Sequence, residues 1–68
     1  MRNIVIETCE QRMTDRRRIC NIGWFKNVPD FEGLLAELEH MGREGLIIQI
    51  DRIPGGMIAD FVPNWSRS

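Results

Sequence analysis

One segment of the sequence has the pattern of a helix with a single apolar side, and this segment constrains the fold most. It covers residues 27–42. Asp30 is a good N-cap, Glu32 lies in the first turn, where the helix dipole favours a carboxylate, and Gly42 or Gly45 can end the helix. At about 100° per residue, one stripe contains the apolar side chains Phe31, Leu34, Leu35, Leu38 and Met41. We expect this stripe to pack against another layer, because burial stabilises so short a helix.

A β-hairpin is predicted after this helix. Two apolar segments, residues 46–53 and 57–62, flank Pro54–Gly56. Proline fixes φ and glycine admits positive φ, a combination that is typical of tight turns. Pro63 is expected to end the second strand, and residues 64–68 to form a polar tail.

A second hairpin is predicted in the N-terminal part of the chain. Residues 3–12 and 17–26 are rich in Ile, Val, Thr, Cys, Trp and Phe, and a polar stretch separates them. With a turn centred on residues 14–15, Cys9 lies opposite Cys20 on the neighbouring strand. A slip of one residue would destroy this pairing.

Together these elements predict a single α+β domain over residues 1–68 with the order ββαββ. A four-stranded antiparallel sheet would pack one face on the single amphipathic helix and leave the other face partly open. The alternative is a winged-helix-like domain, because a helix followed by a Gly-rich hairpin resembles the end of such domains. A winged helix normally needs two further helices upstream, and the β-branched and aromatic residues found there favour ββαββ.

Size and composition are those of a small globular protein. The 68 residues are 43% hydrophobic and 28% charged, and at this length about 60% of the surface of the unfolded chain is buried on folding. No segment approaches the roughly 20 apolar residues that cross a bilayer, and the N-terminus has no signal-peptide pattern. We therefore expect a cytoplasmic protein, without membrane association, whose two cysteines are reduced thiols.

No pattern in the sequence predicts a catalytic or metal site. Cys9, Cys20 and His40 lack the spacing of zinc ligands, and His40 lies opposite the apolar stripe of its helix. No nucleophile motif or phosphate-binding loop occurs, and a carboxylate pair such as Asp51 and Asp60 would need an enclosing pocket for acid–base work. We expect a protein that is not an enzyme and that binds neither metal nor cofactor.

Charge is distributed unevenly along the chain. The net charge of −1 combines +3 over residues 1–26 with −4 over residues 27–68. The side chains that could bind phosphates lie in the first part, where aromatic residues are interleaved with them: Arg12, Arg16, Arg17, Arg18 and Lys26. These residues, or the Pro54–Gly56 turn acting as a wing, are the candidate site of a small nucleic-acid-binding regulator.

The sequence favours a larger protein or ribonucleoprotein complex as the partner. A sheet covered by one helix cannot hide all its large side chains, and the helix has carboxylates in its last turns, where its dipole disfavours them. The predicted contact residues are Trp24, Phe25, Trp65, Glu37, Glu39 and Glu44.

In size, mixed charge and lack of catalytic motifs, the chain resembles the small accessory proteins of phages and mobile elements, including inhibitors of the anti-CRISPR type. This resemblance implies a protein that inhibits or redirects a host complex by occluding one of its functional surfaces. A homodimer that pairs edge strands or open sheet faces is compatible with either function.

Overall fold

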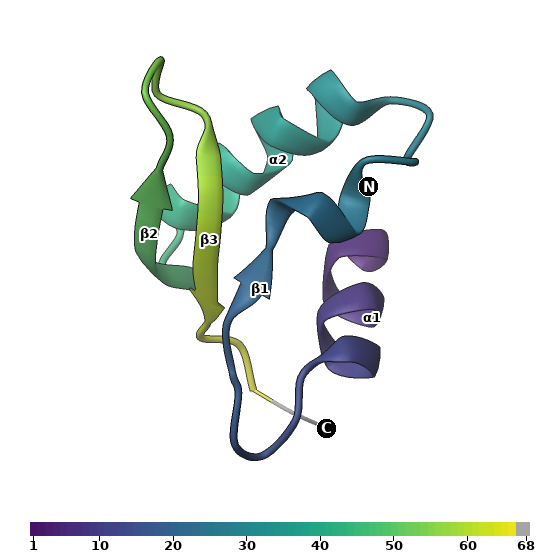
Figure 1. Ribbon diagram of the computed structural model, residues 1–68, viewed down its shortest axis with the longest axis vertical. Coiled ribbons are helices and arrows are strands. Elements are labelled where there is room, and N and C mark those ends of the chain that lie inside the picture. Colours follow the sequence, from purple (N-terminus) through teal and green to yellow (C-terminus); the bar gives the residue numbers. More distant parts are fainter. Residues whose placement is uncertain (67–68) are drawn as a thin grey trace.

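The computed structural model describes residues 1–66 and contains two α-helices, one 3-10 helix and a three-stranded antiparallel sheet (Figure 1). The elements are α1 (Arg2–Arg12), β1 (Cys20–Asn21), η1 (Ile22–Phe25), α2 (Phe31–Arg43), β2 (Ile47–Arg52) and β3 (Ile58–Pro63). The strand order is β1-β3-β2, so β3 is central. The α+β class is confirmed, whereas the ββαββ order with four strands is wrong. No helix of this part of the chain has the length and hydropathy needed to span a membrane.

The first predicted strand, residues 3–12, is the helix α1 instead. Val5, Cys9 and Met13 are buried and lie four residues apart, so they follow each other along one face of a helix. The consecutive residues Ile4, Val5 and Ile6 obscured this spacing, because β-branched residues are typical of strands. The remainder of α1 consists mostly of residues with moderate or good helix propensity, and tertiary burial of one face decides the outcome.

The second predicted strand, residues 17–26, shrinks to the two-residue strand β1. Cys20 pairs with Phe61, and Asn21 pairs with Asp60. The chain then leaves the sheet because the side chain of Asn21 accepts a hydrogen bond from the backbone N–H of Gly23 at 2.7 Å, which starts η1. The predicted cross-strand pairing of Cys9 with Cys20 is therefore wrong.

Helix α2 lies where the sequence predicts it. The carboxylate of Asp30 accepts a hydrogen bond from the N–H of Gly33 at 3.0 Å and caps the first turn. The chain leaves the helix after Arg43 and reaches Gly45, whose φ of +78° lies in the left-handed region. The helix buries Leu34, Leu38 and Met41.

The predicted hairpin around Pro54–Gly56 is confirmed. Strands β2 and β3 pair antiparallel, and Gly55 and Gly56 have φ values of 105° and 96°, which glycine adopts without strain. The N–H of Ile53 donates to the carbonyl of Met57 at 2.9 Å and closes the turn.

The outer strand β2 carries a bulge. Ile48 pairs with Val62 but Asp51 pairs with Asp60, so β2 has one additional residue between these pairs. Gln49 lies in this interval with a φ of 52°, a left-handed conformation that is uncommon outside glycine. The bulge disturbs the free edge of β2, which makes this edge a poor template for pairing with a second copy.

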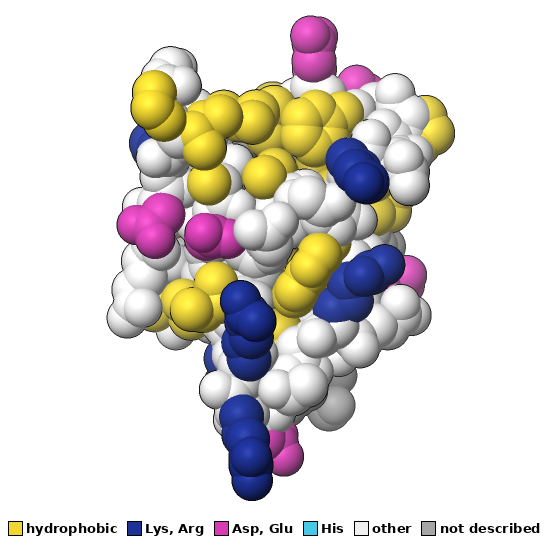
Figure 2. Space-filling view, viewed as in Figure 1, with side chains coloured by type: hydrophobic (Ala, Val, Ile, Leu, Met, Phe, Trp, Pro, Cys, Tyr) yellow, Lys and Arg dark blue, Asp and Glu magenta, His cyan; other side chains and the backbone are white. Residues whose placement is uncertain are grey.

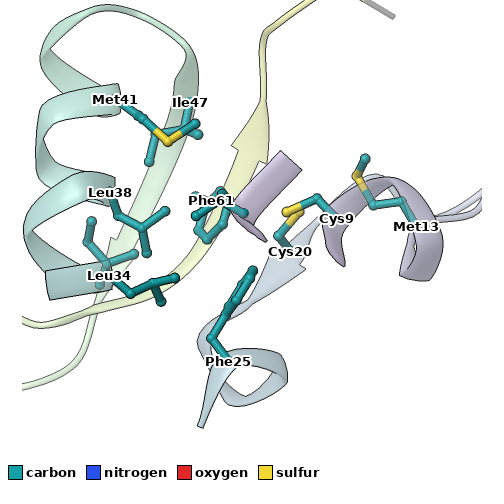
Figure 3. Close-up of a cluster of buried hydrophobic side chains, with 11 residues drawn as sticks. Cys9, Met13, Cys20, Phe25, Leu34, Leu38, Met41, Ile47 and Phe61 are labelled. Carbon is teal, nitrogen blue, oxygen red and sulfur yellow. The ribbon is translucent and has the colours of Figure 1, made fainter. Parts of the chain in front are cut away.

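The core lies where α1, α2 and η1 meet the central strand β3. Phe61 of β3 is at its centre, and its ring centroid lies 6.5 Å from that of Phe25 in η1 (Figure 3). Leu34 and Leu38 close one side of the cluster. The fully buried side chains with less than 2% exposure are Val5, Cys9, Cys20, Phe25, Leu34, Leu38, Met41, Ile47, Ile58 and Phe61.

The start of the predicted polar tail folds back on the domain. Asn64 donates from its backbone to Leu46 at 2.8 Å and from its side-chain amide to the carbonyl of Gly45 at 2.9 Å. Residues 67–68 of the tail lie outside the described residues.

Candidate functional site

The aromatic residues predicted as partner contacts are mainly occupied inside the domain. Phe25 is fully buried against Phe61. Trp24 and Trp65 are half-buried and pack against the core. The indole N–H of Trp65 donates to a carboxylate oxygen of Glu10 at 3.3 Å. These three residues do not form one exposed aromatic patch.

The carboxylates predicted as an acidic docking face are paired with arginines from other elements. The guanidinium of Arg2 in α1 contacts both Glu37 and Glu44, and Arg52 in β2 donates two hydrogen bonds to Glu39, at 2.6 and 3.0 Å. The Arg52 guanidinium lowers the pKa of Glu39, mainly through these hydrogen bonds. The acidic side of α2 is therefore largely neutralised within the molecule.

The basic residues predicted to bind nucleic acid, unlike the carboxylates of α2, have no ion-pair partners among the described residues. Four arginines lie in residues 12–18, which comprise the last residue of α1 and most of its connection to β1, and we call this segment the arginine loop. All four side chains are exposed, and no carboxylate of residues 1–66 forms an ion pair with any of them. The four residues are Arg12, Arg16, Arg17 and Arg18.

The arginine loop is held by its own hydrogen bonds. The backbones of Thr14 and Arg17 exchange two N–H to carbonyl bonds of 3.1 Å, and the hydroxyl of Thr14 accepts a third bond of 3.1 Å from the N–H of Arg17. Asp15 and Arg16 form the tip of this tight turn. The turn predicted at residues 14–15 is thus shifted by one residue, and it connects a helix to a strand instead of two strands. Its backbone is ordered before any ligand arrives.

A cation–π contact links the arginine loop to η1. The guanidinium carbon of Arg12 lies 5.9 Å from the ring centroid of Trp24. Lys26, which is also exposed, follows two residues after Trp24. The structure therefore places one basic group of the arginine loop over the partly exposed indole of Trp24.

The surface places basic and apolar side chains at different ends of the molecule. In the space-filling view, Lys and Arg side chains run from the right side of the molecule down to its lower end, where Figure 1 shows the connection between α1 and β1 (Figure 2). The turn between β2 and β3 lies at the upper left, and a band of hydrophobic side chains crosses the upper part of the molecule from there over α2 (Figure 2). Ile53, beside the hairpin turn, is 41% exposed.

Cys9 and Cys20 lie side by side in the core as free thiols (Figure 3). The neighbouring Cys20 thiol and burial raise the pKa of Cys9. Within residues 1–66 no pocket is found, and no three His, Cys, Asp or Glu side chains are placed to hold a metal ion. The expectations of no metal, no cofactor and no catalysis stay predictions.

Sequence reasoning missed two residues that decide the electrostatics, Arg2 and Arg52. Arg2 lies 35 positions from Glu37 in the sequence, and Arg52 lies 13 positions from Glu39. Neither separation is a helical or cross-strand spacing, so no local pattern could have shown that these arginines neutralise α2.

Comparisons with family models, with curated proteins and with solved structures give no match for this chain.

Proposed function

We propose that this protein is a non-enzymatic nucleic-acid-binding module that contacts phosphates through the arginine loop. The observation that carries the proposal is the contrast between two sets of arginines. Arg2 and Arg52 are satisfied by carboxylates, whereas the four arginines of the arginine loop have no ion-pair partner within residues 1–66. The loop thus keeps a concentrated positive charge in a protein whose net charge is −1.

The chemistry of the arginine loop suits a phosphate backbone. Guanidinium groups donate two parallel hydrogen bonds to a phosphate and stay charged at all physiological pH values. The internal hydrogen bonds of Thr14 with Arg17 limit the entropy that would be lost on binding. Exposed positive charge also accelerates the encounter with a polyanion.

The order of elements supports a winged-helix-like interpretation of the fold. The chain has a helix, a strand, a helical turn, a helix and two hairpin strands in succession, and η1 takes the place of one upstream helix. The wing is the weaker candidate contact, because Arg52 is bound by Glu39 and by the carbonyl of Gly56 at 2.9 Å. The arginine loop, at the other end of the molecule, has no such internal partner for its guanidinium groups (Figure 1).

The proposal is tested by two substitutions that remove the same charge. Arg16→Gln removes the arginine at the tip of the arginine loop, and Arg43→Gln removes an exposed arginine at the end of α2 that has no ion pair within residues 1–66. Fluorescence anisotropy with a labelled oligonucleotide duplex should show affinity about three- to tenfold weaker for Arg16→Gln, since a surface contact to a charged group is of that order. Affinity of Arg43→Gln should stay within about twofold of the wild type. Equal losses in both variants, or none in either, would contradict the proposal.

A second candidate function is docking on a larger protein complex, with occlusion of one of its functional surfaces. The exposed Ile53 and the hydrophobic band at the hairpin end favour it (Figure 2). The matched variants are Ile53→Ser and Ile4→Ser, because both isoleucines are 41% exposed. In affinity capture from a nuclease-treated lysate, Ile53→Ser should lose a protein that the wild type and Ile4→Ser retain. Equal capture by both variants would speak against docking at the hairpin.

A further inference from the structure

We propose that the preferred ligand is a single strand and that Trp24 stacks on one of its bases beside the arginine loop. This inference rests on the proposed function and adds a base-contacting residue to the phosphate contacts. The inference concerns the partly exposed side chain of Trp24, whose ring centroid lies 5.9 Å from the guanidinium carbon of Arg12. Lys26 follows Trp24 by two residues in the sequence.

Arg12 lies over the ring of the partly exposed Trp24 at the long end of the cation–π range. A separation of 5.9 Å is near the outer limit of about 6 Å for a cation–π contact, so the guanidinium covers the ring loosely. An unpaired base can replace this contact by stacking on the indole, and the released guanidinium can then stack on the base or bind its phosphate.

The charge beside Trp24 suits a strand that passes over the ring. Arg12 approaches the ring from the end of α1, and Lys26 directly follows η1 in the sequence. The phosphate next to a stacked base would therefore meet the guanidinium of Arg12. A duplex keeps its bases stacked inside, so it can use the arginine loop but gains nothing from the indole.

The other tryptophan does not offer such a surface. The indole N–H of Trp65 is bound to Glu10, and a carboxylate next to the ring repels phosphate. The chain has two tryptophans, so replacing Trp65 gives a protein whose tryptophan fluorescence comes from Trp24 alone.

The first test uses the fluorescence of Trp24 in the Trp65→Phe background. Titration with oligo(dT) should quench this fluorescence saturably, because stacking brings a base onto the indole. A parallel titration with oligo(rU) shows whether the protein prefers single-stranded DNA or single-stranded RNA. Quenching by either strand supports the inference. Titration with a duplex of the same length as the oligo(dT) strand should leave the Trp24 fluorescence unchanged. Binding of the single strands without quenching would overturn the inference.

The second test uses Trp24→Leu, which keeps an apolar side chain against the core, beside Trp24→Phe, which keeps an aromatic plane. Stacking of one base corresponds to roughly five- to hundredfold in affinity. Trp24→Leu should therefore lower the affinity for oligo(dT) by about that factor and should lower the affinity for the duplex far less. Trp24→Phe should keep most of the wild-type affinity for oligo(dT). An unchanged ratio of the two affinities in Trp24→Leu would overturn the inference.

The two proposals fail in different ways. Binding of duplex and single strand with equal, salt-dependent affinity and no role for Trp24 would leave the arginine loop as a phosphate site and remove the stacking residue. Absence of binding to every oligonucleotide would remove both proposals.

Discussion

At the scale of single residues, the position of Gly33 shows what the sequence alone could not reveal. A glycine in the first turn of α2 is unfavourable by helix propensity, yet the carboxylate of Asp30 occupies the space beside Gly33. A Cβ at residue 33 would clash with this carboxylate in its present position. Alanine at residue 33 therefore requires the Asp30 side chain to move, whereas glycine leaves the cap as it is.

The first prediction is that the effect of Gly33→Ala on the stability of the protein depends on whether the Asp30 cap is present. In the wild type, alanine gains about 1 kcal/mol of helix propensity but displaces a cap of similar value, so stability should stay equal or fall. In an Asp30→Ala background the cap is already absent, and Gly33→Ala should stabilise by about 1 kcal/mol. Urea unfolding followed by circular dichroism measures both, and equal stabilisation in the two backgrounds would contradict the close contact.

The second prediction concerns the two cysteines. Both thiols are fully buried, and the pKa of Cys9 is raised by the Cys20 thiol and by burial, which disfavours the reactive thiolate. The native protein should therefore react slowly with a thiol reagent at mildly alkaline pH, and two thiols per chain should titrate after unfolding. The variants Cys9→Ala and Cys20→Ala should each release one thiol. Rapid reaction of the folded protein, or no free thiol in the denatured protein, would contradict this.

At the scale of elements, the sequence predicted α2 and the β2–β3 hairpin well but failed for the N-terminal third. Helix α2 has an N-cap, a clear apolar stripe and a glycine beyond its end, and the hairpin has a turn in which glycine is required. Helix α1 has no side-chain cap and no acidic residue in its first turn, and Val5 and Cys9 are its buried residues. Its structure depends on contacts with distant elements, which a local pattern does not contain.

One such link between elements is the ion pair of Glu39 in α2 with Arg52 in β2, and the third prediction concerns its pH dependence. Since Arg52 lowers the pKa of Glu39 in the folded state, the pair stabilises the protein above the unfolded pKa of about 4.3, and this contribution is lost as pH falls through the lower folded value. Both side chains are more than a third exposed, so solvent screens the pair and its contribution to stability should be small.

Glu39→Gln should accordingly be slightly less stable than the wild type at neutral pH and equally stable in acid below the lowered pKa of Glu39. Glu7→Gln is the control, because Glu7 is exposed and forms no ion pair within the described part of the chain. Urea midpoints across the pH range measure the difference. A difference between Glu39→Gln and wild type that grows as pH falls would contradict the assignment.

At the scale of the whole molecule, the fold rearranges the charge that is visible in the sequence. Residues 1–26 carry +3 and residues 27–68 carry −4, but Arg2 from the first part forms ion pairs with two carboxylates of the second. Of the basic side chains that have no ion pair within residues 1–66, four lie in the arginine loop, and Lys26 and Arg43 lie elsewhere. The candidate basic residues could be named from the sequence, whereas only the three-dimensional pairing shows which charges stay free.

The central claim is that the arginine loop binds phosphates, and the salt dependence of binding tests it most directly. The measurement is the slope of log affinity against log salt concentration for a duplex, compared between the wild type and Arg16/Arg17/Arg18→Gln. Each phosphate contact on duplex DNA contributes about 0.9 to this slope, so the variant should have a slope smaller by roughly two to three. An identical slope in a folded variant would show that these arginines do not meet phosphates, and would contradict the account.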